Sequence, residues 1–167
     1  MEITLLISFL CMLTYTVSII KMFGVPASLS DTYYLLQNKY PNKPTKWLFT
    51  ILCFIIMFTV LISWLDISKE SLQFLCFIAA SGLGFVGAAP HFKSYEYKIH
   101  VAGTVLCALG SQLWLWLSGY WYTSLIALAL MAIPAFKQKK NYTFYAEMAA
   151  FLSAYLGIGI EYLKKLI

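Results

Sequence analysis

The sequence contains little charge and no arginine. Only 11% of its 167 residues are charged, whereas 61% are hydrophobic, and soluble domains carry about 25% charged residues. A water-soluble fold of this size would lack the polar residues needed to cover its surface. The absence of arginine excludes a bidentate guanidinium clamp on a phosphate group. Any phosphate contact must therefore come from lysine, histidine or backbone amides.

Recognisable cofactor motifs are also missing from the sequence. The four cysteines form no CxxC pair, and each lies in an apolar segment, which is typical of small buried side chains; they are Cys11, Cys53, Cys76 and Cys107. There is no HExxH or HxxxH pair, no nucleotide-binding loop and no nucleic-acid motif. We expect no cofactor, no bound metal and no nucleic-acid partner.

What the sequence does contain is a series of long apolar segments. Six of them have a length close to the roughly 20 residues that cross a bilayer, and they cover about 3–22, 47–65, 72–89, 99–117, 121–136 and 145–163. They are too long and too uniform for barrel strands. The first begins directly after Met1-Glu2, without the basic region of a signal peptide, so we expect it to be retained. The sequence predicts an all-α polytopic transmembrane helix bundle, a single domain over residues 1–167.

The lysines are distributed unevenly between the loops. Nine of the twelve lie in or beside the first, third and fifth loops, namely Lys21, Lys39, Lys43, Lys46, Lys93, Lys98, Lys137, Lys139 and Lys140. Positively charged loops stay in the cytoplasm. We therefore expect an integral membrane protein with odd-numbered loops in the cytoplasm and both termini outside. In the first loop, 23–46, Ser28 or Ser30 is expected to cap a short interfacial helix that begins near Asp31.

Small residues recur every four positions in two of the segments. Ala80, Gly84 and Ala88 share one face of the third segment, and Ala149, Ser153 and Gly157 share one face of the sixth. This spacing lets helices approach closely in lipid. The stripes indicate packing within one bundle; a dimer seam or a thinned wall around a ligand is the alternative.

Titratable side chains that could carry chemistry are few. If the predicted topology holds, Asp31, His91, His100 and Glu147 lie at the same membrane boundary. A group of carboxylates and histidines in that position suits acid–base catalysis. Ser28 or Ser30 would add a nucleophile, although no GxSxG elbow is present. The simpler alternative is that these residues cap helices and contact lipid headgroups.

The layout resembles a known family of small membrane proteins. Leu29-Ser30-Asp31 lies in the first loop, a glycine-rich third segment ends at Gly87, and His100 opens the fourth. In these respects the chain is similar to the six-helix proteins related to the damage-regulated autophagy modulator group and their bacterial relatives of unknown function. The resemblance implies a six-helix fold in a bacterial cytoplasmic membrane and supplies no catalytic residue. Ceramidase-like membrane hydrolases also combine serine, aspartate and histidine, but this sequence lacks their HxxxH pair.

Three functions remain open from the sequence. The first is a lipid-interacting or partner-binding membrane component, whose partners would be membrane lipids, another membrane protein or a second copy of the chain. The second is a lipid-modifying enzyme that uses the four titratable residues. The third is a passive channel or transporter subunit, which would need a polar path past Tyr15 and Gln112. No charged residue lies near the middle of any segment, which argues against an ion-driven pump.

Overall fold

The computed structural model describes residues 2–166, which form seven α-helices, four single-turn 3-10 helices and no strand. The α-helices are α1 (Glu2–Phe23), α2 (Thr32–Lys39), α3 (Trp47–Ile67), α4 (Gln73–Ala88), α5 (Glu96–Leu117), α6 (Trp121–Gln138) and α7 (Tyr142–Leu166). The 3-10 turns are Pro44–Lys46, Glu70–Leu72, Ala89–His91 and Lys93–Tyr95. The all-α fold predicted from the apolar segments is therefore confirmed over the described residues.

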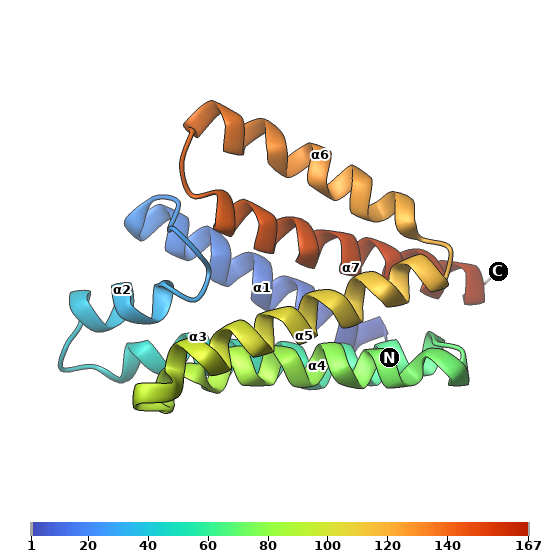
Figure 1. The fold of residues 1–167 in the computed structure, drawn as a ribbon, viewed down its shortest axis with the longest axis horizontal. Coiled ribbons are helices and arrows are strands. Elements are labelled where there is room, and N and C mark those ends of the chain that lie inside the picture. The colour runs from blue at the N-terminus through green and yellow to red at the C-terminus, as the bar shows by residue number, and fades with distance from the viewer. Residues whose placement is uncertain (1, 167) are drawn as a thin grey trace.

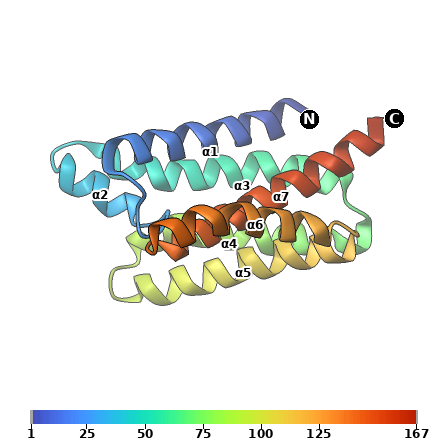
Figure 2. The same cartoon turned by 90° about the horizontal axis from the view of Figure 1, so that it is seen from above.

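The six long helices alternate in direction, so their connections gather at two opposite ends of the bundle (Figure 1). We call one the α2 end, because it carries the short helix α2 together with the connections 24–31, 89–95 and 139–141. We call the other the termini end, because both chain ends lie there beside the connections 68–72 and 118–120. Figure 2 shows α1 beside α3 and α4 beside α5.

Five of the described helical segments are long and apolar enough to cross a membrane, one fewer than the six expected from the sequence. They are Ile3–Phe23, Trp47–Ile67, Glu70–His91, Glu96–Leu117 and Tyr142–Lys165. The sixth expected segment does form helix α6, but that helix has only 18 residues and is polar at both ends. After Trp121 it continues with Tyr122, Thr123 and Ser124, and it ends with Lys137 and Gln138. These polar residues lower the mean hydropathy of the helix.

The short helix α2 folds over the end of the bundle. The Asp31 amide donates to Ser28 Oγ at 3.2 Å, so Ser28 orders the turn that leads into the helix. Tyr33 is buried in the same core cluster as residues of α1 and α3, and Leu36 is also buried. The hydroxyls of Tyr15 and Thr32 lie 2.5 Å apart and join α1 to α2. These contacts hold the segment before α2 against the long helices.

Helices α4 and α5 form the most extensive helix pair, and glycine makes their approach possible. A Cβ added to Gly82 would lie 2.6 Å from the Gly103 carbonyl oxygen, and one added to Gly110 would lie 2.8 Å from the Ala79 amide nitrogen. Real Cβ atoms do not come this close to backbone atoms. The two backbones are therefore in contact along most of the length of α5.

The expected stripe of Ala80, Gly84 and Ala88 lies on a face of α4 other than the one that contacts α5. A Cβ on Gly84 would lie 2.8 Å from Met57 Sδ of α3, and Ala80 is buried, whereas Ala88 is half-buried. The face that contacts α5 instead carries Ala79 and Gly82.

The stripe on α7 faces α5 and α6. Ala149 is only 2% exposed. Ser153 Oγ accepts a hydrogen bond from Gln112 Nε2 at 3.0 Å, while Gln112 Oε1 accepts one from Ser124 Oγ at 2.7 Å. A Cβ on Gly157 would collide with the Leu115 side chain. These residues join α5, α6 and α7 in the half of the bundle nearest the termini.

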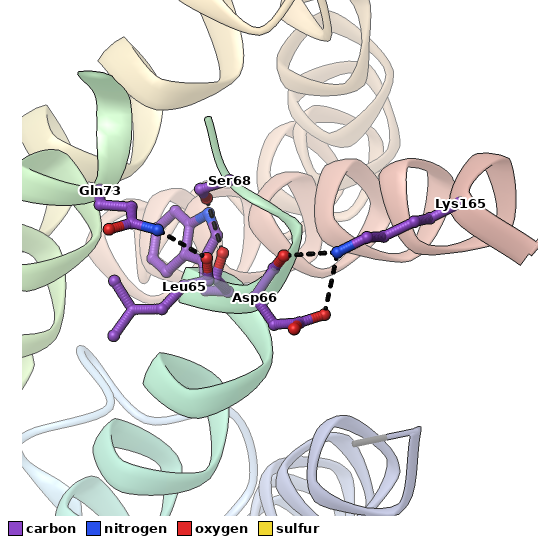
Figure 3. Close-up of polar contacts among 6 residues, drawn as sticks. Leu65, Asp66, Ser68, Gln73 and Lys165 are labelled. Atoms are coloured by element: carbon purple, nitrogen blue, oxygen red, sulfur yellow. Dashed lines mark hydrogen bonds and ion pairs between the residues drawn. The ribbon is translucent and has the colours of Figure 1, made fainter. Parts of the chain in front are cut away.

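Polar contacts close the termini end. Lys165 Nζ of α7 lies 3.2 Å from the Asp66 carboxylate and donates to the Asp66 carbonyl at 2.7 Å, as Figure 3 shows. The Tyr120 hydroxyl donates to Glu161 and accepts from Lys164. Burial and the bond to Glu161 raise the pKa of Tyr120, so its hydroxyl stays protonated and remains a donor at neutral pH.

Replacing Gly82 with alanine should destabilise the bundle. The new Cβ would meet backbone atoms of α5, which cannot move aside without separating the helices, and overpacking of this kind costs about 1–3 kcal/mol. Gly159→Ala is the control, because a Cβ there meets nothing within 4 Å and alanine favours a helix by up to about 1 kcal/mol. Thermal unfolding in detergent, followed by circular dichroism, should rank Gly159→Ala at or above the native chain and Gly82→Ala below it. Equal melting temperatures for the two variants would contradict the close α4–α5 contact.

Candidate functional site

The site lies where α5 and α7 separate. The two helices are joined near the termini end, where Gln112 contacts Ser153 and Leu115 contacts Gly157. Toward the α2 end, α5 follows α4 while α7 follows α6, so α5 and α7 diverge (Figure 1). The space between them is a cavity of about 930 Å³.

Four helices and two further segments line this cavity. The lining comes from α3, α4, α5, α7 and the segment 28–34, and the connection 89–95 adds Ala89, Pro90 and Ser94. On α5 it extends from Glu96 to Ser111, and on α7 from Thr143 to Ile158. At 1.5 Å per residue, each of these helical stretches is about 22 Å long. The cavity is therefore an elongated slot that follows the helices from the α2 end toward the termini end.

The carboxylate and imidazole groups of the lining all lie at the α2 end of the slot. They are Asp31, Glu96, His100 and Glu147, accompanied by Ser28, Ser30 and Ser94. Deeper in the slot the walls are mostly apolar, with Ile56, Leu83, Phe151 and Ile158 among them. The cavity is amphipathic along its length, polar at one end and apolar through most of its depth.

Glu147 is anchored by the loop that closes the α2 end. Its Oε2 atom accepts a hydrogen bond from the Leu29 amide at 2.6 Å. The loop is held to the start of α7 by two further bonds: Asn141 Nδ2 donates to the Val25 carbonyl at 2.8 Å, and the Phe144 amide donates to the Ala27 carbonyl at 3.1 Å. The half-buried Glu147 carboxylate is thus fixed at the polar end of the slot.

Ser30 and His100 face each other across this end of the cavity. Ser30 Oγ lies 3.4 Å from His100 Nε2 and 3.0 Å from Ser28 Oγ. Asp31 and Glu96 are close enough to act electrostatically on the His100 ring. The nearby Glu96 carboxylate also adds to the effect of burial in raising the pKa of Tyr33, so that phenol stays neutral. A serine, a histidine and carboxylates therefore gather in one place.

His91 lies apart from this group. Its ring stacks on Trp47 with centroids 4.3 Å apart, and its Nε2 lies 3.2 Å from Thr50 Oγ1. It is exposed and is not among the residues that line the cavity. Of the four titratable candidates from the sequence, the fold brings together Asp31, His100 and Glu147. His91 is directed elsewhere because the 3-10 turn Ala89–His91 places it against the start of α3.

The sequence reasoning passed over several lining residues. Glu96 lies one helical turn before His100, and Thr104, Ala108 and Ser111 continue the same face of α5. The spacing of four between Glu96 and His100 was a readable signal. Tyr155 of α7 also lines the slot, and its hydroxyl bonds to Ser8 of α1.

Two buried polar atoms of residues that line the cavity have no hydrogen-bond partner among the described residues. They are the Thr104 hydroxyl and the Trp64 indole nitrogen, and Trp64 as a whole is 3% exposed. Buried polar groups are almost always satisfied by protein, water or ligand.

The slot is also open on one side. Tyr97, Val101 and Val105 of α5 line it and are exposed, as are Thr143 and Ala146 of α7. The opening therefore lies between α5 and α7, on the flank of the bundle. Helix α6 packs against α7 and none of its described residues lines the slot.

Within residues 2–166, no group of three or more histidine, cysteine, aspartate or glutamate side chains is arranged to hold a metal ion. The chain matches no protein-family model, no curated protein and no solved structure. The resemblance to the six-helix autophagy-modulator relatives therefore stays a prediction, and the argument for function rests on the cavity.

Proposed function

We propose that this chain is an integral membrane protein that binds a single amphiphilic lipid in the slot between α5 and α7. The observation that carries this proposal is the distribution of chemistry along the cavity. Its carboxylate and imidazole groups lie together at one end, and its depth is mostly apolar. An amphiphile has the same asymmetry, with a polar head and an apolar tail.

The size of the slot supports a lipid occupant. Its volume of about 930 Å³ lies near the upper limit of the roughly 300–1,000 Å³ typical of small-molecule sites. Its length of about 22 Å exceeds the roughly 15 Å that one leaflet contributes to the hydrocarbon core. A long acyl chain can therefore extend along the slot while its head remains at the α2 end.

The lateral opening supplies a route of entry. Exposed Val101 and Val105 border the slot on a helix apolar enough to cross a membrane. In a bilayer that border would face acyl chains, so a lipid could enter sideways without leaving the membrane. The lysine-rich loops lie at the α2 end, which favours placing that end, and the polar part of the slot, at the cytoplasmic face.

A channel is less well supported than a lipid site. The polar path expected for a channel would pass Tyr15 and Gln112, yet neither side chain lines the slot. Tyr15 bonds to Thr32, and Gln112 bonds to Ser153 and Ser124. Both polar groups therefore serve contacts between helices.

Filling the slot should remove the bound lipid. Ala108 lines the cavity on α5, whereas Ala102 lies on the same helix, is exposed and is not part of the lining. Overpacking an occupied site costs about 1–3 kcal/mol, so Ala108→Phe should lower lipid occupancy about tenfold while Ala102→Phe leaves it unchanged. Native mass spectrometry of protein purified in mild detergent should show one lipid adduct on the native chain and on Ala102→Phe. Equal adducts on both variants would refute the proposal.

A second candidate function is hydrolysis of a lipid ester or amide, and the proximity of Ser30 Oγ to His100 Nε2 favours it. On this route His100 accepts the Ser30 proton while Ser30 Oγ attacks the acyl carbonyl, and His100 then passes that proton to the departing alcohol or amine. Water, deprotonated by His100, hydrolyses the acyl-Ser30 ester, which releases the acid and restores Ser30. Asp31 and Glu96 would stabilise the imidazolium that forms. This candidate uses Asp31 and His100 from the sequence-based set and omits His91.

This second function makes a distinct prediction. On the hydrolase account, the purified protein releases 4-methylumbelliferone from its palmitate ester, Ser30→Ala abolishes the release, and His100→Gln lowers it by about 100-fold or more. Ser71→Ala, an exposed residue at the termini end, is the control and should retain full activity. Release that is absent from the native protein, or retained by Ser30→Ala, would eliminate the hydrolase and leave the lipid-binding proposal intact.

A further inference from the structure

Resting on the proposed lipid-binding function, we infer that the slot selects an amphiphile whose head carries a positively charged amine. Two features of the polar end carry this inference: the sign of its charge and the lack of a described lysine that could neutralise it.

The charge lining the slot is opposite in sign to that of the chain. The protein carries a formal net charge of +5, with twelve lysines against seven acids. Three of those acids, Asp31, Glu96 and Glu147, line the polar end of the slot, and no lysine whose side chain the structure describes lines it. The one ionisable group in the lining that can become positive is His100. An anionic head would therefore meet three carboxylates, whereas an ammonium head would be attracted by all of them.

Among the side chains that the structure describes, these carboxylates form no ion pair with a lysine. The only ion pair among the described side chains is Lys165–Asp66 at the termini end. Glu147 has one hydrogen bond, from the Leu29 amide, and Asp31 lies close enough to interact with it electrostatically. Half-buried carboxylates beside an apolar cavity are costly unless a positive charge or a proton compensates them. An ammonium group donates three hydrogen bonds and would compensate them directly.

Thr104 lies on the α5 wall of the slot, below the acids of its polar end. Its buried hydroxyl has no partner among the described residues and lies one helical turn deeper than His100. A hydroxyl or carbonyl oxygen that links head to tail would reach that depth when the amine is held near Glu147. Below Thr104, the α5 wall continues with Cys107 and Ala108, which suits the start of the tail.

Three probes with the same tail test this inference. Octadecylamine, octadecanol and octadecanoate differ only in the charge of the head, which is positive, neutral and negative at neutral pH. Equilibrium binding of each radiolabelled probe to the purified protein should favour octadecylamine over octadecanol by about tenfold or more, the size of a hydrogen bond to a charged group, with octadecanoate weakest.

Substitutions at the polar end separate charge from shape. Glu147→Gln keeps an acceptor for the Leu29 amide but removes the charge, so it should weaken octadecylamine binding about tenfold and leave octadecanol binding unchanged. Asp31→Asn should act in the same direction and serves as the second variant if Glu147→Gln does not fold. Glu70→Gln, an exposed acid at the termini end, is the matched control and should behave like the native protein.

The possible outcomes distinguish this inference from the function on which it rests. Loss of amine preference in Glu147→Gln or Asp31→Asn, with retained octadecanol binding, would support the inference. Equal binding of all three probes, each lost in Ala108→Phe, would overturn the amine selectivity and retain the lipid site. Binding of none of the probes, together with equal lipid adducts on Ala108→Phe and Ala102→Phe, would overturn both.

Discussion

The backbone contact between α4 and α5 is the constraint on which the rest of the bundle depends. Gly82, Gly103 and Gly110 remove the side chains that would keep the two helices apart, so α5 follows α4 along its length. The tight turn at 118–120 then sends the chain into α6, and α7 packs back onto α6. Helices α5 and α7 consequently meet only near that turn. The slot at the α2 end forms because α5 packs on α4 while α7 packs on α6, which leaves α5 and α7 apart there.

The same division explains why polar side chains gather at one end. Glu96 and His100 lie on the part of α5 that has left α7, and Glu147 lies on the part of α7 that has left α5. The loop before α2 spans the gap and brings in Ser30 and Asp31. In lipid, side chains of this kind are retained where they face a cavity, a partner or water. A cavity with a polar end thus gives these residues a position compatible with an apolar bundle.

Much of the fold could be predicted from the sequence because apolar length and lysine-bearing loops are local signals. All six predicted segments form helices at nearly the predicted positions. The serine cap expected on α2 is absent, because the helix begins after Asp31 with no side-chain cap, and Ser28 bonds instead to the Asp31 amide in the preceding turn. The pairing of helices was not a local signal. The spacing of four residues predicted a packing face through Gly84, whereas the face of α4 that contacts α5 carries Gly82. These two faces can be distinguished only when the neighbouring helices are known. His91 was grouped with His100 because of their proximity in sequence, but a 3-10 turn directs it to Trp47.

The central claim is that the slot between α5 and α7 holds a lipid while the helices span a bilayer. An electron cryomicroscopy structure of the purified protein in a lipid nanodisc, made tractable by a bound antibody fragment, tests both parts directly. Our account predicts the long apolar helices across the disc and elongated density in the slot, with its head beside Glu147 and its tail running toward Trp64. A slot closed by contact of α5 with α7 along their whole length, or helices lying outside the bilayer, would contradict it.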